Sequence, residues 1–181
     1  MVVRCSVPRP TRNQASLLPP IVFRTRGAEL LGLGAFLALC LAISAIGGLI
    51  TAASVGTWYQ TLQKPVFNPP DWVFAPVWTL LYLMIAVAGW RVWRIAGVAG
   101  ARAGMAAYAA QLALNLAWSY LFFGARMIGL ALAEIVLLLG VICVNALLFW
   151  RKDQVAGWLL VPYAAWVTFA CALNFALWRL N

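Results

Sequence analysis

Residues 58–78 read WYQTLQKPVFNPPDWVFAPVW and separate two long apolar runs. The stretch contains three Trp, two Phe, one Tyr and four Pro, with a single Lys and a single Asp. Proline removes a backbone donor and clashes with the preceding helical turn, so this stretch cannot be one continuous helix. Long connections in compact proteins are commonly lids or binding loops. The sequence therefore predicts that the connection at about 51–71 covers a binding site.

Composition places the chain in a membrane. Of its 181 residues, 65% are hydrophobic and only 9% are charged, whereas soluble domains carry about 25% charged residues. The net charge of +9 comes from Lys and Arg that flank the apolar runs, where such residues anchor membrane spans. No nucleic-acid-binding motif is present. These features indicate an integral membrane protein that contacts the lipid bilayer and does not bind nucleic acid.

The chain offers little for metal or nucleophilic chemistry. It has no His, and its four cysteines show no CxxC spacing. Three of the cysteines lie within apolar runs, where a thiol behaves as a small hydrophobe. We therefore expect no metal site, no structural disulfide, no covalent cofactor and no catalytic residue, and binding is favoured over catalysis.

Five apolar runs are each long enough to cross a bilayer of about 30 Å, which takes about 20 helical residues. The short connections after the second run predict antiparallel neighbours, and Asp71 and Asp153 are candidate helix N-caps. The fold class is thus an all-α integral membrane protein, a five-transmembrane-helix bundle. Its helices are expected at about 29–50, 72–94, 104–123, 127–149 and 154–178.

The first 27 residues differ from the remainder. They hold five Arg and four Pro, and no acid precedes Glu29. We expect a disordered tail at 1–27, followed by one membrane domain at 28–181; an organelle-targeting peptide is the alternative, but the prolines would disrupt its amphipathic helix. Counting Lys and Arg gives ten on the side of the N-terminus and three on the other. The positive-inside rule then places the N-terminus in the cytoplasm and the aromatic loop outside.

Helix periodicity separates inward from outward faces in the third span. Its polar face, with an adjacent Trp, is expected to point into the bundle because polar amides facing lipid are costly. That face consists of Gln111, Asn115, Trp118 and Ser119. The opposite face is small, which favours either a homodimer contact or close packing within the same chain. It consists of Ala106, Ala109, Ala113 and Ala117.

Aromatic and amide side chains in other spans point to a common pocket. Trp78 and Tyr82 share a stripe of the second span, and Trp166 shares one with Asn174 in the fifth. Together with Trp118 they predict an internal pocket below the aromatic loop. Glu134 is the one clear acid within a span. We expect it near the interface, hydrated or paired with Arg126, and an internal polar contact is the alternative.

Three long motifs closely resemble the TspO/translocator-protein family, which comprises bacterial tryptophan-rich sensory proteins and the mitochondrial peripheral-type benzodiazepine receptor. They are WYQTLQKPVFNPPDWVFAPVWTLLYLMIAVAGW, QLALNLAWSYLFFG and VPYAAWVTFACALNFALWRLN. The resemblance covers about 30–181. It implies a five-helix bundle, commonly dimeric through the third helix, that binds protoporphyrin IX or haem. In some members cholesterol and isoquinoline or benzodiazepine ligands bind as well.

The resemblance also implies the site. Carried over by motif, the ligand-binding residues are Trp58, Phe67, Asn68, Trp72, Trp78, Tyr82, Asn115, Trp118, Ala165, Trp166 and Asn174. Phe175 stands where the proposed cholesterol motif has Tyr, so a sterol is the less favoured ligand. The resemblance implies a receptor, carrier or sensor in a bacterial cell envelope or, otherwise, the mitochondrial outer membrane. A porphyrin-degrading photo-oxidative enzyme and a sterol or porphyrin transporter are the alternatives.

Overall fold

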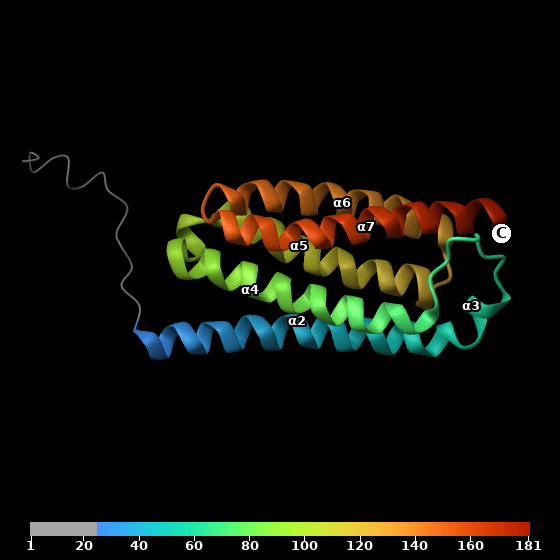
Figure 1. Ribbon diagram of the computed structural model, residues 1–181, viewed down its shortest axis with the longest axis horizontal. Coiled ribbons are helices and arrows are strands. Elements are labelled where there is room, and N and C mark those ends of the chain that lie inside the picture. The colour runs from blue at the N-terminus through green and yellow to red at the C-terminus, as the bar shows by residue number, and fades with distance from the viewer. Residues whose placement is uncertain (1–24) are drawn as a thin grey trace, which may run out of the picture.

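A computed structural model describes residues 25–181, and all regular structure in that range is helical, which confirms the all-α prediction. Figure 1 shows long helices side by side in an elongated bundle, with the short helix α3 at one end. The elements, in chain order, are α2 (Arg26–Val55), α3 (Trp58–Thr61), the 3-10 helix η1 (Asp71–Val73), α4 (Phe74–Gly100), α5 (Arg102–Ser119), the π-helix η2 (Tyr120–Gly124), α6 (Ile128–Trp150) and α7 (Gln154–Leu180).

Within residues 25–181, four helical segments are long and apolar enough to cross a membrane. They are Arg26–Val55, Asp71–Gly100, Ile128–Trp150 and Gln154–Leu180. The 18-residue α5 is shorter, and Arg102, Gln111 and Asn115 make it less apolar. Four of the five predicted spans therefore have the required length and apolarity. The third predicted span, at about 104–123, stays a prediction.

The first helix begins earlier than predicted. Thr25 lies at its N-cap, where the Oγ1 atom accepts a hydrogen bond from the Ala28 N–H at 3.3 Å. The helix then continues to Val55, beyond the predicted end at residue 50. The helix therefore includes Arg26 and Gly27 of the predicted tail, and residues 1–24 lie outside the described range.

The helices form a closed ring. α2 packs on α4, α4 on α7, α7 on α6 and α6 on α5, while α5 and η2 return to α2. The contact between α4 and α5, which were expected to be neighbours, is minor because α4 packs mainly on α2 and α7. At the end of α4, Gly97 adopts a φ of 65°, a left-handed conformation that glycine reaches without steric cost. This break lets the chain turn towards α5.

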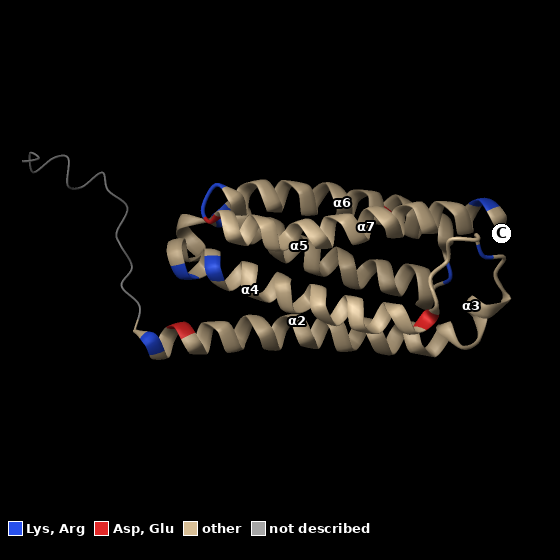
Figure 2. Cartoon of the chain, viewed as in Figure 1, with Lys and Arg blue, Asp and Glu red and all other residues tan. Residues whose placement is uncertain are grey.

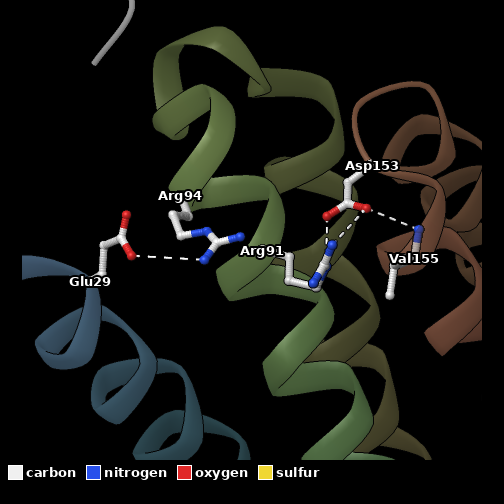
Figure 3. A network of polar contacts seen from close by, with 5 residues as sticks. All are labelled: Glu29, Arg91, Arg94, Asp153 and Val155. Carbon is white, nitrogen blue, oxygen red and sulfur yellow. Dashed lines mark hydrogen bonds and ion pairs between the residues drawn. The ribbon is translucent and has the colours of Figure 1, made fainter. Parts of the chain in front are cut away.

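Charged side chains gather at the two ends of the bundle (Figure 2). At the end where α2 begins, Arg91 Nε donates to Asp153 Oδ2 at 2.6 Å, and a second Arg91 nitrogen lies 3.2 Å from Asp153 Oδ1. Figure 3 shows this fork, together with the longer ion pair of 3.8 Å between Arg94 and Glu29. The two pairs join α4 to the start of α7 and to α2.

Asp153 caps α7 as predicted, because its Oδ1 accepts from the Val155 N–H at 2.9 Å. Burial by itself raises the pKa of this carboxyl, but the hydrogen bond and charge of Arg91 outweigh burial and hold the pKa of Asp153 below its usual value. The corresponding prediction for Asp71 is wrong. Asp71 begins η1, makes no cap hydrogen bond, and instead accepts from Gln60 Nε2 at 2.7 Å.

Glu134 departs from the favoured prediction. Both of its carboxylate oxygens are buried and have no hydrogen-bond partner among the described residues. No ion pair joins it to Arg126 in that range. The predicted pairing with Arg126 is therefore wrong, and both oxygens are closed to bulk solvent. The side-chain amides of Gln111 and Asn145 are likewise buried without partners in the described part of the chain.

Candidate ligand-binding site

Two tryptophans from different helices stand between two cavities near the α3 end of the bundle. Trp78 of α4 and Trp118 of α5 line both cavities, as do Phe74 and Phe123. Trp118 is fixed by a hydrogen bond from its Nε1 to Asn174 Oδ1 at 3.1 Å. Trp78 and Trp118, called the partition here, therefore lie between a cavity next to α2 and a cavity next to α7.

The cavity on the α7 side, called the inner chamber here, is small. Its volume is about 20 Å³, which is close to the space that one water molecule needs. The chamber is walled by aromatic rings packed edge to face or stacked, such as Trp118 and Phe122 with ring centres 5.3 Å apart. Its lining residues are Tyr59, Phe74, Trp78, Trp118, Phe122, Phe123, Trp166, Phe169, Ala170, Leu173, Asn174 and Leu177.

The cavity between α2 and α4, called the outer cleft here, is much larger. Its volume of about 330 Å³ falls within the range of about 300–1,000 Å³ found for small-molecule sites. Small side chains of α2 leave this room, and a Cβ added at Gly48 would meet nothing within 4 Å. The lining residues are Ser44, Gly47, Gly48, Thr51, Ala52, Val55, Asp71, Phe74, Ala75, Trp78, Thr79, Tyr82, Trp118 and Phe123.

The π-helix η2 brings two phenylalanines into the site. Phe122 and Phe123 are both buried, with ring centres 4.8 Å apart. The wider π-turn leaves carbonyl groups without their usual helical partners, and the buried Ser54 hydroxyl donates to the Phe123 carbonyl at 2.7 Å. Arg126 then takes a φ of 60°, unusual for a residue with a side chain. The chain can thus reverse into α6 directly behind the chamber.

Residues 56–73, called the lid here, are held by local and long-range hydrogen bonds. The buried Tyr59 hydroxyl donates to Asn68 Oδ1 at 2.6 Å. Burial and, second, the nearby charge of Asp71 raise the pKa of Tyr59 to about 12, so this phenol keeps its proton at neutral pH. Asn181, beyond α7, bonds to the Gln63 backbone with both side-chain atoms, at 2.9 and 3.1 Å. The lid is therefore an ordered layer tied to the end of α7.

The structure divides the eleven site residues expected from the sequence into groups. Five line the cavities: Trp78, Tyr82, Trp118, Trp166 and Asn174. Asn115 lies within the bundle and donates to the Tyr163 hydroxyl at 2.7 Å rather than lining either cavity.

The lid residues among the eleven lie behind or away from the cavity walls. Trp58 packs on Phe122 with ring centres 5.8 Å apart, and Phe67 packs on Phe169 at 6.3 Å. Asn68 accepts the Tyr59 hydrogen bond. Trp72 is 74% exposed, Ala165 of α7 is also exposed, and neither lines the chamber or the cleft.

Sequence reasoning did not find several lining residues. Phe74, Phe122, Phe123 and Phe169 surround the partition, and Asp71 enters the outer cleft. The Phe-Phe pair that directly follows the polar face of α5 was the available signal for η2. Nothing local distinguishes Asp71 from an ordinary helix cap.

The apolar helices, the aromatic cavities and the charge distribution define an integral multi-pass membrane protein. The chain belongs to the TspO/MBR family, whose family model matches residues 36–179. It is 40% identical over 160 residues to the tryptophan-rich protein TspO of Chlorobaculum tepidum, covering 84% of this chain and 98% of that protein. It is also 40% identical to the translocator protein of Sus scrofa, over 77% of this chain and 86% of that one. The tryptophan-rich sensory protein of Cereibacter sphaeroides is 40% identical over 81% and 89%.

Proposed function

We propose that the protein is a membrane receptor, carrier or sensor that binds tetrapyrroles, such as protoporphyrin IX or haem, against the Trp78–Trp118 partition. The observation that carries the proposal is this pair of indoles beside a cleft of about 330 Å³. Aromatic pairs contribute about 0.5–1.5 kcal/mol each beyond the burial of their area. A flat, extended π-system is the ligand that such a partition suits best.

The outer cleft supplies the space and the inner chamber the inward wall. Because the chamber holds only about 20 Å³, a large ring enters from the α2 side and reaches deeper only if Trp166 or Phe169 moves. The chain contains no His, which is the usual protein ligand of haem iron. We therefore expect metal-free protoporphyrin to bind about as tightly as haem.

A titration of the purified protein in nanodiscs tests this proposal. Protoporphyrin IX binding is followed through porphyrin fluorescence, which remains usable when a Trp is replaced. We expect Trp118→Ala to weaken binding by about tenfold, equivalent to the loss of one aromatic stacking partner. Trp158→Ala is the matched control, since Trp158 packs on Trp150 at the opposite end of the bundle and is 60% exposed. Equal affinities for the wild type and Trp118→Ala would refute the proposal.

The same titration under illumination separates a binder from a porphyrin-degrading enzyme. The chain has no His to act as a general base, and residues 25–181 contain no cluster of three or more His, Cys, Asp or Glu. We expect the porphyrin absorbance to bleach under light no faster than it does with empty nanodiscs. Faster bleaching that Trp78→Phe and Trp166→Phe abolish would favour the enzyme.

The proposal includes five spans, with α5 and η2 together forming the third. Residues 102–124 make a continuous helical run, which is long enough to cross a bilayer. Six described Lys and Arg lie at the end where α2 begins, namely Arg26, Arg91, Arg94, Arg102, Arg151 and Lys152, and three at the lid end, namely Lys64, Arg126 and Arg179. This bias supports a cytoplasmic start of α2 and a lid on the outer side.

We also propose a homodimer through α5. Of the four alanines on the predicted face, Ala106, Ala109 and Ala113 are exposed and Ala117 is half-buried, so most of the face is open to a partner. Beside them lies an open apolar groove of about 620 Å³ between α5 and α6. Faces of small residues let membrane helices approach closely.

A further inference from the structure

The outer cleft contains an acid that forms no direct ion pair with a described Lys or Arg. Asp71 lines the cleft, and no Lys or Arg does. Asp71 Oδ2 accepts from Gln60 Nε2 at 2.7 Å, while Lys64 Nζ donates to Gln60 Oε1 at 2.8 Å. Within residues 25–181, Asp71 takes part in no ion pair. Lys64 therefore approaches Asp71 only through the Gln60 amide, and the carboxylate beside the lid end of the cleft has no directly paired cation among the described residues.

The walls of the cleft are suited to a cation. Trp78, Tyr82 and Trp118 present ring systems, and aromatic faces attract cations within about 6 Å of the ring centre. The two nearby cations, Lys64 and Arg126, lie over rings that do not line the cleft. Lys64 Nζ lies 4.4 Å from the ring centre of Tyr59, and the Arg126 guanidinium lies 5.8 Å from that of Trp58. No described Lys or Arg makes a cation–π contact with Trp78, Tyr82 or Trp118.

The spacing along η1 and α4 favours an amphiphile. Trp78 follows Asp71 by seven residues and Tyr82 by eleven, which corresponds to about 10 and 16 Å at the α-helical rise of about 1.5 Å per residue. A ligand that satisfies both ends carries its charge at the lid and an apolar, aromatic body deeper in the bundle. We infer that the outer cleft is a binding site for amphiphilic organic cations, with Asp71 as counter-ion and Trp78 and Trp118 as the apolar wall.

This inference goes beyond the proposed function, because protoporphyrin IX carries two carboxylates and thus the opposite charge. The two ideas respond in opposite directions to one change. Asp71→Asn weakens the binding of a cation, whereas it raises the affinity for protoporphyrin IX, because it removes a negative charge beside the site of a dianionic ligand. Failure of one therefore does not imply failure of the other.

The experiment compares a charged probe with its uncharged counterpart. The cation is (biphenylmethyl)trimethylammonium, and the control is its carbon isostere, in which carbon replaces the quaternary nitrogen. Binding to nanodiscs of zwitterionic lipid is measured by equilibrium dialysis, with empty nanodiscs subtracted. We expect the wild type to prefer the cation and Asp71→Asn to lower cation affinity by at least about fivefold, the effect of one close charge in a water-like dielectric. The affinity of the isostere is expected to stay constant.

Two matched controls locate the effect. Glu29→Gln removes an equal charge at the opposite end of the bundle, where Glu29 pairs with Arg94, and is expected to change nothing. Gly48→Phe fills the cleft and is expected to abolish binding of both probes. Gly34→Phe, 14 residues earlier on α2 and equally unobstructed, is expected to leave binding intact.

Three outcomes would overturn the inference. They are equal affinity of the wild type for the two probes, an Asp71→Asn effect no larger than that of Glu29→Gln, and binding that survives Gly48→Phe. If Asp71→Asn fails to fold, the wild type decides instead. Added salt must then weaken binding of the cation and leave binding of the isostere unchanged. Cation binding that does not change with salt concentration would overturn the inference.

Discussion

Two hydrogen bonds between the lid and the end of α7 allow a direct test of how the lid controls access to the cavities. Asn181 Oδ1 accepts from the Gln63 N–H at 2.9 Å, and Asn181 Nδ2 donates to the Gln63 carbonyl at 3.1 Å. The same Nδ2 also reaches the Leu177 carbonyl at 2.9 Å, which orients the side chain. Asn181→Ala removes both lid bonds and leaves the Tyr59–Asn68 bond in place.

The expected magnitude follows from the exposure of these groups. A hydrogen bond contributes about 0.5–1.5 kcal/mol net, and pairs open to solvent lie at the lower end. Two such bonds give about 1 kcal/mol for closure of this segment. Because 1.4 kcal/mol is a factor of ten in an equilibrium constant, the open fraction of the lid should rise about fivefold.

Amide hydrogen exchange measures that fraction. We expect exchange at Gln63 to quicken about fivefold in Asn181→Ala, with no change at the amides of the α4 interior. Asn181→Asp keeps an acceptor and loses the donor, so its exchange should fall between the two. Arg179→Ala, two residues before Asn181 and exposed, is the control for disturbance of the α7 end. Unaltered exchange at Gln63 in Asn181→Ala would refute this account of the lid.

Three further predictions concern stability and assembly. Asp153→Asn should lower the free energy of unfolding by about 2 kcal/mol, between the values for exposed and buried ion pairs. Because the folded-state pKa of Asp153 is lowered, the stabilisation by its carboxylate is complete above about pH 3.9 and is lost as the pH falls further. Unfolding measured against pH should therefore show an acid step in the wild type that the variant lacks. Gly89→Leu should destabilise by at least about 1–3 kcal/mol in detergent unfolding, because even a Cβ would lie 2.7 Å from the Tyr108 ring. Ala113→Trp should convert a dimer to a monomer in light scattering, and Ala42→Trp on the exposed surface of α2 should not.

Helical periodicity was sufficient to find much of the candidate site. Apolar runs of about 20 residues mark the long helices, since the length of a span is set by the bilayer. Trp78, Trp118, Trp166 and Asn174 were placed inward because each shares a helical stripe with other polar or aromatic residues, and all four line a cavity. These inferences use spacing within a single helix, which the sequence displays directly.

Features that depend on distant or irregular backbone were not predictable in this way. The clamp from Asn181 to Gln63 joins residues 118 positions apart. The π-helix η2 shifts the register of Phe122 and Phe123 relative to an α-helix, so a period of 3.6 residues misplaces them. Ala165 was assigned by motif, but its position on α7 turns it outward.

The failed cap at Asp71 connects these departures to the site. An Asp that follows two prolines is a strong local signal for a helix start, yet its carboxylate bonds to Gln60 of the lid and faces the outer cleft. Close by, η2 breaks the α-helical pattern and Arg126 adopts a positive φ. At the opposite end of the bundle, Asp153 and Thr25 cap their helices as local rules require. Exceptions to local rules concentrate where proteins trade stability for function, and here they concentrate around the lid, the partition and the cleft.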